Sequence, residues 1–169
     1  AGVPLVIGSC GTCGTASTVD WMFEITCELA AELGQTLRVA RLYSDVPVEA
    51  LRHARDADRL TPLHPAQATD DDALAGMTNI VALAGAEQIQ AAINTGADVV
   101  LAGRATDTAT IAALPLAHGA HAGGAWHGAK IAECGAFCTT RPTSGVIMVS
   151  FDETGFTVTP MGEGVQCTP

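Results

Sequence analysis

The chain has 169 residues, a hydrophobic content of 48%, an aromatic content of 4% and a formal net charge of −10. This length suits one domain, with a core built mainly from small aliphatic side chains. The excess of acidic residues disfavours nucleic acid as a partner, because phosphate binding needs positive charge. No apolar run reaches the ~18 to 20 residues of a membrane span, and the first residues do not resemble a secretory leader. We therefore expect a soluble, cytoplasmic protein without a membrane partner.

A short apolar run at 3–7 predicts a buried strand, and the glycine-rich turn GSCGTCGTASTVDW follows it. Three glycines and three hydroxyl residues alternate in this turn: Gly8, Ser9, Gly11, Thr12, Gly14 and Thr15. Its N–H groups, together with the start of the next helix, could hold a carboxylate or phosphate. The turn matches neither GxxxxGK[ST] nor GxGxxG, so it is no nucleotide fingerprint.

The next helix is expected to begin with Ser17 or Thr18 as its N-cap, to carry Asp20 in its first turn and to end near Gly34. Four apolar residues spaced four apart predict its buried face: Trp21, Ile25, Leu29 and Leu33. Cys27 lies in the same apolar stretch, so we expect it to be buried.

A strand at 37–43 and a helix at 48–60 follow, and then a proline-containing connector ends in three aspartates, one of which we expect to cap a helix. Residues 73–94 show a long helical pattern with a break near Gly85. Residues 118–127 predict a flexible loop and 126–138 a helix. Apolar runs at 145–150 and 155–159 around a DETG turn predict a β-hairpin.

The apolar run at 98–102 predicts another buried strand, and polar residues follow it closely: Gly103, Arg104, Thr106, Asp107 and Thr108. Thr106 or Asp107 could cap the next helix, while Arg104 adds a cation. Ligands of open α/β sheets bind at the carboxyl ends of strands, which makes this loop the leading candidate for a binding surface. Alternatively, Arg104 and Asp107 only form a cap and an ion pair.

Strands alternate with helices along the chain, which is typical of an α/β fold with a mostly parallel sheet flanked by helices. The hairpin adds an antiparallel unit near the C-terminus. We expect residues 1–169 to form a single α/β domain that is a segment of a longer protein.

The densest reactive chemistry lies in WHGAKIAECGAFC. On a helix, His127, Lys130 and Cys134 would line one face, with Glu133 to the side. An imidazole, a cation and a thiol could together activate a nucleophile or transfer a proton. Alternatively, Lys130 and Glu133 form a surface pair while Cys134 is packed.

The six cysteines leave a different class of function open. Without a secretory leader, free thiols are favoured over disulfides. However, CxxC at the start of a helix lowers thiol pKa and suits redox exchange, and four thiolates suit zinc. The candidate thiols for such a metal or redox module are Cys10, Cys13, Cys134 and Cys138. Otherwise no cofactor is predicted.

Four ordered blocks resemble the acyclic terpene utilisation family, the AtuA-like proteins of bacteria. They are GSCGTCGTASTVDW, GADVVLAGRATDTA, AWHGAKIAECGA and DETGFTVTPMGEGVQCTP. The resemblance covers practically the whole chain and corresponds to an internal section of a longer member. It implies catabolism of acyclic terpenoids or branched acids, commonly handled as coenzyme A thioesters.

The resemblance also implies which positions belong to the site. They are the turn from Gly8 to Thr15, Asp20, Trp21, the loop from Gly103 to Thr108, Trp126, His127, Lys130, Glu133 and Cys134. Family members often have a smaller residue than cysteine at position 10 or 13, which disfavours an essential role for both thiols.

Our leading hypothesis is an enzyme or enzyme part that binds a small anionic acyl substrate. Arg104 and the glycine turn would hold the anion, His127 or Asp107 would transfer a proton, and Lys130 would stabilise developing negative charge. Hydratase, lyase or isomerase chemistry next to a carbonyl fits these groups. The other parts of the full-length protein or a companion subunit, and a second copy in a homo-oligomer, are the expected protein partners. A non-catalytic assembly segment is the remaining alternative.

Overall fold

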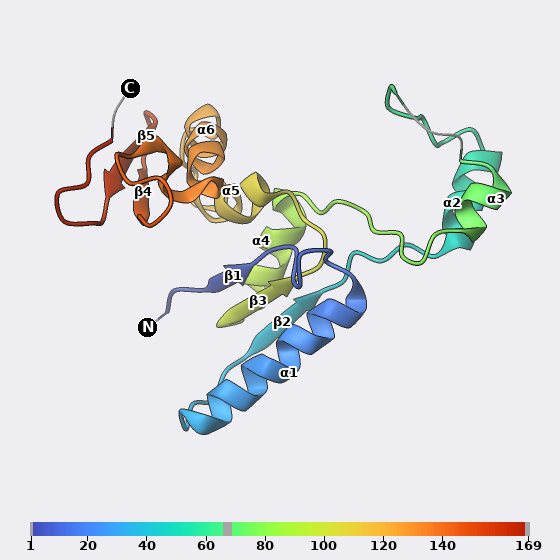
Figure 1. Cartoon of the computed structure of the whole chain (residues 1–169), viewed down its shortest axis with the longest axis horizontal. Coiled ribbons are helices and arrows are strands. Elements are labelled where there is room, and N and C mark those ends of the chain that lie inside the picture. Colours follow the sequence, from blue (N-terminus) through green and yellow to red (C-terminus); the bar gives the residue numbers. More distant parts are fainter. Residues whose placement is uncertain (1, 66–68, 168–169) are drawn as a thin grey trace.

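A three-stranded parallel sheet forms the centre of the protein (Figure 1). The computed structural model describes residues 2–65 and 69–167. In spatial order the strands are β1 (Leu5–Ile7), β3 (Val99–Ala102) and β2 (Val39–Leu42). The register aligns Val99 with both Leu5 and Val39. All four residues of β3 are buried, as its uninterrupted apolar sequence predicts.

Helices cover both faces of this sheet. Val99 and Leu101 face α1 (Ala16–Glu32), whereas Ala102 faces α4 (Ala86–Asn94) and α5 (Asp107–Ala117). This alternation follows from the two-residue period of a strand. The α/β architecture predicted from the sequence is therefore confirmed.

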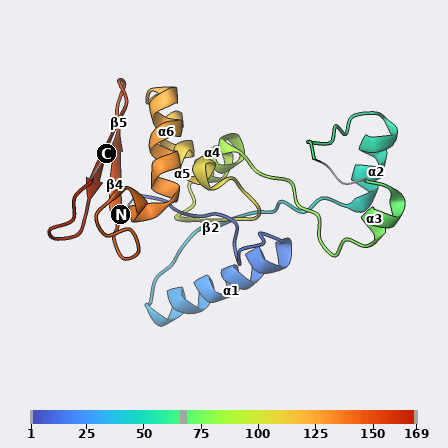
Figure 2. The ribbon, with the colours of Figure 1, turned by 45° about the horizontal axis from the view of Figure 1, so that its top comes forward.

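The C-terminal third packs beside α5 rather than on the sheet (Figures 1 and 2). Helix α6 (Ala122–Glu133) lies against α5 and is followed by the 3₁₀ helix η1 (Gly135–Cys138). Strands β4 (Ile147–Phe151) and β5 (Phe156–Pro160) form the predicted antiparallel hairpin, which packs on α6. The short helices α2 (Val48–Asp56) and α3 (Asp71–Ala75) form a lobe set apart from the sheet.

Small side chains fill the core between α4, β3 and α5, as the composition predicts. Its buried members are Ala84, Ala86, Ile89, Ala102, Ala105, Ala109 and Ala113. Short side chains allow close approach of the backbones, so this part of the core is held by many short-range contacts. Within the described ranges, no helix is both long enough and apolar enough to cross a membrane.

The predicted buried face of α1 is wrong. Trp21, Leu29 and Leu33 are 55%, 51% and 68% exposed, and Cys27 is also exposed. Val19, with Met22 and Phe23 partly buried beside it, packs against the sheet instead. Helix α1 has apolar residues on more than one side, so the four-residue spacing alone could not identify the side that is buried.

The bounds of three predicted helices are also wrong. Residues 76–85 are not helical, and they separate α3 from α4. Helix α6 begins inside the predicted loop, with His121 as its N-cap accepting from the Gly124 N–H at 3.0 Å. The helix ends at Glu133, because Gly135 adopts a positive φ of 59° that is incompatible with helix continuation.

The helix predicted at 48–60 ends at Asp56, and Asp58 follows with a φ of 54°. Asp70 caps α3 by accepting from the Ala73 N–H at 2.8 Å, which confirms that one of the three consecutive aspartates is a cap.

Candidate functional site

The turn after β1 and the loop after β3 interlock at the carboxyl edge of the sheet. The Ser9 N–H donates to the Gly103 carbonyl at 3.1 Å, and the Arg104 N–H donates to the Gly14 carbonyl at 2.9 Å. The Ser9 hydroxyl reaches further along the loop and donates to the Ala105 carbonyl at 3.2 Å. Each loop therefore holds the other in place, and the two predicted binding segments are brought together.

Gly14 makes this close approach possible. Its φ is +69°, and a Cβ at this position would overlap the backbone N and Cα of Arg104. Two non-glycine residues of the same turn, Ser9 and Thr12, also have positive φ, of 48° and 68°. Conformations of this kind cost free energy and are found mainly where the surroundings enforce them, often at functional sites.

Two further segments complete this edge of the sheet. The Ser44 hydroxyl donates to the Arg104 carbonyl at 2.9 Å. The Ala84 N–H also donates to the Arg104 carbonyl at 2.9 Å, and the Thr106 N–H donates to the Ala84 carbonyl at 3.1 Å. The sequence does not predict residues 80–84 at this edge, because the pattern at 73–94 indicates a long helix. The available signal was the pair of β-branched residues Ile80 and Val81 in a stretch bounded by glycines.

The start of α1 is already occupied by an anion from the chain itself. Its N-cap is Thr15, not the predicted Ser17 or Thr18, and the Thr15 side chain makes no capping bond. Instead, a carboxylate oxygen of Asp45 accepts from the Ala16 N–H at 2.6 Å. Asp20, which was predicted in the first turn, lies beyond it, so Asp45 supplies the negative charge that this helix start favours. The exposed part of the turn and Arg104 are left for an external ligand.

Arg104 presents a cation at this edge. Its side chain is exposed, and its guanidinium donates to the Thr12 carbonyl at 3.2 Å. Across residues 2–65 and 69–167, no carboxylate forms an ion pair with it, so its other N–H groups can bind an anion. Thr106, one of the two predicted candidates, is the N-cap of α5 and accepts from the Ala109 N–H at 3.1 Å, whereas Asp107 lies in the first turn.

A second charged group lies at the first turn of α5. Glu133 accepts hydrogen bonds from the Lys130 ammonium and from the Thr108 hydroxyl. These bonds, that from Lys130 first, hold the pKa of Glu133 below its usual value. The Glu133 carboxylate raises the pKa of Lys130, with smaller contributions from Cys134 and Asp107 nearby. Five predicted site residues, Asp107, Thr108, Lys130, Glu133 and Cys134, therefore lie near one another. The alternative of a Lys130–Glu133 pair is also realised, but Cys134 is exposed and not packed as that alternative expected.

Other predicted site residues lie elsewhere. The His127 ring packs edge-on against Phe156, with ring centroids 5.1 Å apart. Asp20 pairs with Arg41 at 2.8 Å, and Trp126 is 40% exposed on α6. Cys134 is the C-cap of α6, directly after Glu133, and is exposed. Across the described ranges, no hydrogen bond or ion pair joins His127 to Arg104.

The two thiols of the CxxC motif have opposite environments. Cys10 is 1% exposed, and its burial raises the pKa of its thiol. Cys13 is exposed, and hydrogen bonds between its sulfur and the Thr15 N–H, the Thr15 hydroxyl and the Thr18 hydroxyl lower its pKa. A lowered pKa is the direction predicted for a thiol at a helix start. Among the residues with described positions, no three His, Cys, Asp or Glu side chains are grouped to hold a metal ion. The zinc alternative is not tested by this and stays a prediction.

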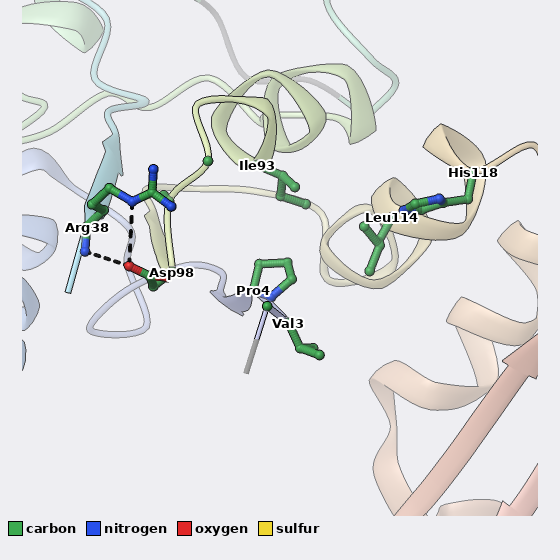
Figure 3. Close-up of a pocket in the computed structure, with 10 residues that line it drawn as sticks. Val3, Pro4, Arg38, Ile93, Asp98, Leu114 and His118 are labelled. Atoms are coloured by element: carbon green, nitrogen blue, oxygen red, sulfur yellow. Dashed lines mark hydrogen bonds and ion pairs between the residues drawn. The ribbon is translucent and has the colours of Figure 1, made fainter. Parts of the chain in front are cut away.

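A hollow of about 300 Å³ lies at the opposite, amino end of the sheet (Figure 3). Val3, Pro4, Ile93 and Leu114 form its apolar part, and Arg38 and His118 lie on its two sides. Asp98 accepts from the Arg38 N–H at 2.8 Å and lies 3.8 Å from its guanidinium Nε. Since this cation is already close to a carboxylate, it attracts an anion less strongly than Arg104 does.

Fold and site together define an α/β protein with polar loops at the carboxyl edge of a parallel sheet and, there, a cation that has no carboxylate partner among the described residues. The family model described as "Acyclic terpene utilisation family protein AtuA" matches residues 6–163. The chain therefore belongs to the acyclic terpene utilisation family, which confirms the resemblance and connects the protein with acyclic terpene utilisation. Neither the curated proteins nor the solved structures compared with the chain gave a match.

The close approach at Gly14 gives a test by mutation. Gly14→Ala is expected to lower the free energy of unfolding by about 3 to 5 kcal/mol, because positive-φ strain adds to overlap with the Arg104 backbone. Gly34→Ala is the matched control: Gly34 also has a positive φ, of 61°, but open space around it. It should lose about 1 to 2 kcal/mol. Denaturant unfolding measures both, and equal losses would contradict the interlocked loops.

The CxxC thiols should differ in reactivity. Iodoacetamide is expected to alkylate Cys13 much faster than Cys10. The Cys13 rate should reach half its maximum at a pH below the pKa of an ordinary thiol. Thr15→Val removes one of the hydroxyl groups and should move that midpoint to higher pH. Peptide mass spectrometry across a pH series measures the rates. Equal labelling of both thiols in the native protein would contradict the assigned burial.

Proposed function

We propose that the carboxyl edge of the sheet binds a small anionic acyl substrate in the utilisation of acyclic terpenoids or related branched acids. The observation that supports this most directly is the exposed Arg104 guanidinium, anchored on Thr12 and without a carboxylate partner in the described part of the chain. In a protein with a net charge of −10, a cation left unpaired at the usual ligand edge of an α/β sheet favours an anionic ligand.

The proposed anion is a carboxylate, or a phosphate of a coenzyme A thioester. A guanidinium binds either group through paired N–H donors, and one N–H of Arg104 is already used to orient its side chain. The exposed backbone of residues 11–13 lies beside it and supplies the adjoining wall. Asp45 occupies the helix start, so the ligand would bind on the Arg104 side of the turn.

The proposed chemistry is proton transfer next to a carbonyl, as in hydration, dehydration or isomerisation. Asp107 is an exposed carboxylate in the first turn of α5 and is our candidate base. Lys130 stays protonated beside Glu133 and would stabilise the negative charge that develops on the acyl oxygen. His127, which the sequence analysis gave a proton-transfer role, lies against the hairpin and is not used in this proposal.

Two thiols, Cys134 and Cys13, are alternative reactive groups within the same proposal. Cys134 follows α6 directly and lies near the charge of Lys130, so it could act as a nucleophile there. Cys13 combines exposure with a lowered pKa at the turn that binds Arg104. The Cys13 thiol could therefore serve as an acyl acceptor. The sequence indicates a lowered pKa from the position of CxxC at a helix start, but it does not identify the hydrogen bonds with Thr15 and Thr18 that contribute to it.

Substitution of Arg104 tests the proposed anion site. Arg104→Ala should weaken binding of a branched acyl-coenzyme A thioester or its free acid by about tenfold to a hundredfold, because a charge-assisted hydrogen bond is lost. The melting temperature should fall only slightly, because the side chain is exposed and loses one hydrogen bond, to the Thr12 carbonyl, while the backbone bonds that join the loops are kept. Titration calorimetry with the purified chain and a panel of these compounds measures the affinity.

Arg59→Ala is the matched control, because it removes an equal charge from an exposed position beyond α2. It should leave the affinity unchanged. Equal weakening in both variants would indicate attraction to overall charge, and an unchanged affinity in Arg104→Ala would overturn the assignment.

A further inference from the structure

The segment after β5 returns to the end of η1 and pairs with it. Thr139 and Cys167 form an antiparallel bridge, and the Thr140 N–H donates to the Gln166 carbonyl at 2.9 Å. The Gln166 N–H in turn donates to the Thr140 hydroxyl at 3.2 Å. These bonds hold Cys167 beside the residue that follows Cys138.

Each of the two backbone segments is also held by contacts with other parts of the C-terminal region. The Thr139 hydroxyl is buried and donates to the Ala136 carbonyl at 2.8 Å, which fixes the end of η1. The Met161 N–H donates to the Val146 carbonyl at 2.8 Å, and Val165 is 8% exposed. Hydrogen bonds and packing therefore hold the two segments close together. Little conformational freedom remains to be lost when their side chains react.

Their two thiols are neighbours and can be reached from solvent. Cys138 is half-buried, Cys167 is exposed, and both are free. Desolvation and the nearby Cys138 thiol together raise the pKa of Cys167.

We propose that Cys138 and Cys167 form a reversible redox pair that a small disulfide, such as oxidised glutathione, converts into an intramolecular disulfide. The Cys167 thiolate attacks one sulfur of oxidised glutathione, forming a mixed disulfide and releasing one glutathione thiolate. The Cys138 thiolate then attacks the Cys167 sulfur and releases the second. The two protein thiols lose two electrons and two protons, and one oxidised glutathione becomes two reduced molecules.

The disulfide would fasten residues 161–167 to η1 and close the hairpin into a covalent loop. It would also restrain the chain just after Glu133 and Cys134, although the redox pair does not depend on the proposed acyl site. Because the pKa of Cys167 is raised, its thiolate fraction and the oxidation rate should increase as pH rises above neutrality.

The test is to incubate the full chain with oxidised glutathione and to locate the cross-link by mass spectrometry. Trypsin cannot separate the two cysteines, because the only basic residue after Lys130 is Arg141, which precedes a proline. Cleavage at Asp152 or Glu153 places them on different peptides. We expect these peptides to stay joined until a reductant is added, and the oxidised chain to melt at a higher temperature than the reduced one.

Single substitutions identify the partners. Cys138→Ser and Cys167→Ser should each lower the yield of joined peptides by at least about tenfold, whereas Cys134→Ser, the matched control, should keep it. Cys138→Ser should accumulate the glutathione adduct at Cys167. Joined peptides that persist in Cys138→Ser but disappear in Cys134→Ser would overturn the pairing, as would adducts without a cross-link in the unmutated chain.

Discussion

The hydrogen bond from the Arg104 N–H to the Gly14 carbonyl, 2.9 Å long, is the contact on which the arrangement of the candidate site depends. It joins the loops that follow β1 and β3, and only a residue without a Cβ fits at position 14. The carbonyl of the same residue accepts from Ser44 and from Ala84. The backbone of Arg104 therefore connects four segments of the chain and fixes where the Arg104 side chain begins.

Arg104 differs from several other basic residues of the chain in its charged surroundings. The chain carries 18 acidic and 8 basic residues, and several of the basic side chains are paired with carboxylates. Asp45 neutralises the start of α1, and Glu133 is bonded to Lys130. Arg104 instead donates one N–H to the neutral Thr12 carbonyl, and this bond orients the guanidinium without cancelling its charge.

The sequence was sufficient to predict the central strand, the hairpin and the Thr106 cap, because each depends on neighbouring residues. Val99 to Ala102 is apolar without interruption, and the DETG turn lies between two apolar runs. The convergence of the two loops was also predictable, since parallel strands end at the same edge of a sheet. The outcome supports the use of local patterns for elements of this kind.

Features that depend on distant residues could not be predicted in this way. The residue that occupies the start of α1, Asp45, lies 29 positions from the N–H group it binds. The exposed face of α1 depends on which of its apolar sides meets the sheet, and the sequence contains more than one. His127 was expected at the site from its spacing to Lys130, yet its ring contacts Phe156 of the hairpin.

Hydrogen exchange of the purified chain with and without a branched acyl-coenzyme A thioester tests the central claim most directly. If the carboxyl edge of the sheet is the ligand site, exchange should slow in residues 8–15 and 103–108 when the ligand is present. Slower exchange confined to residues 2–4, 96–98 and 114–118, which line the hollow in Figure 3, would place the ligand at the other end of the sheet and contradict the account.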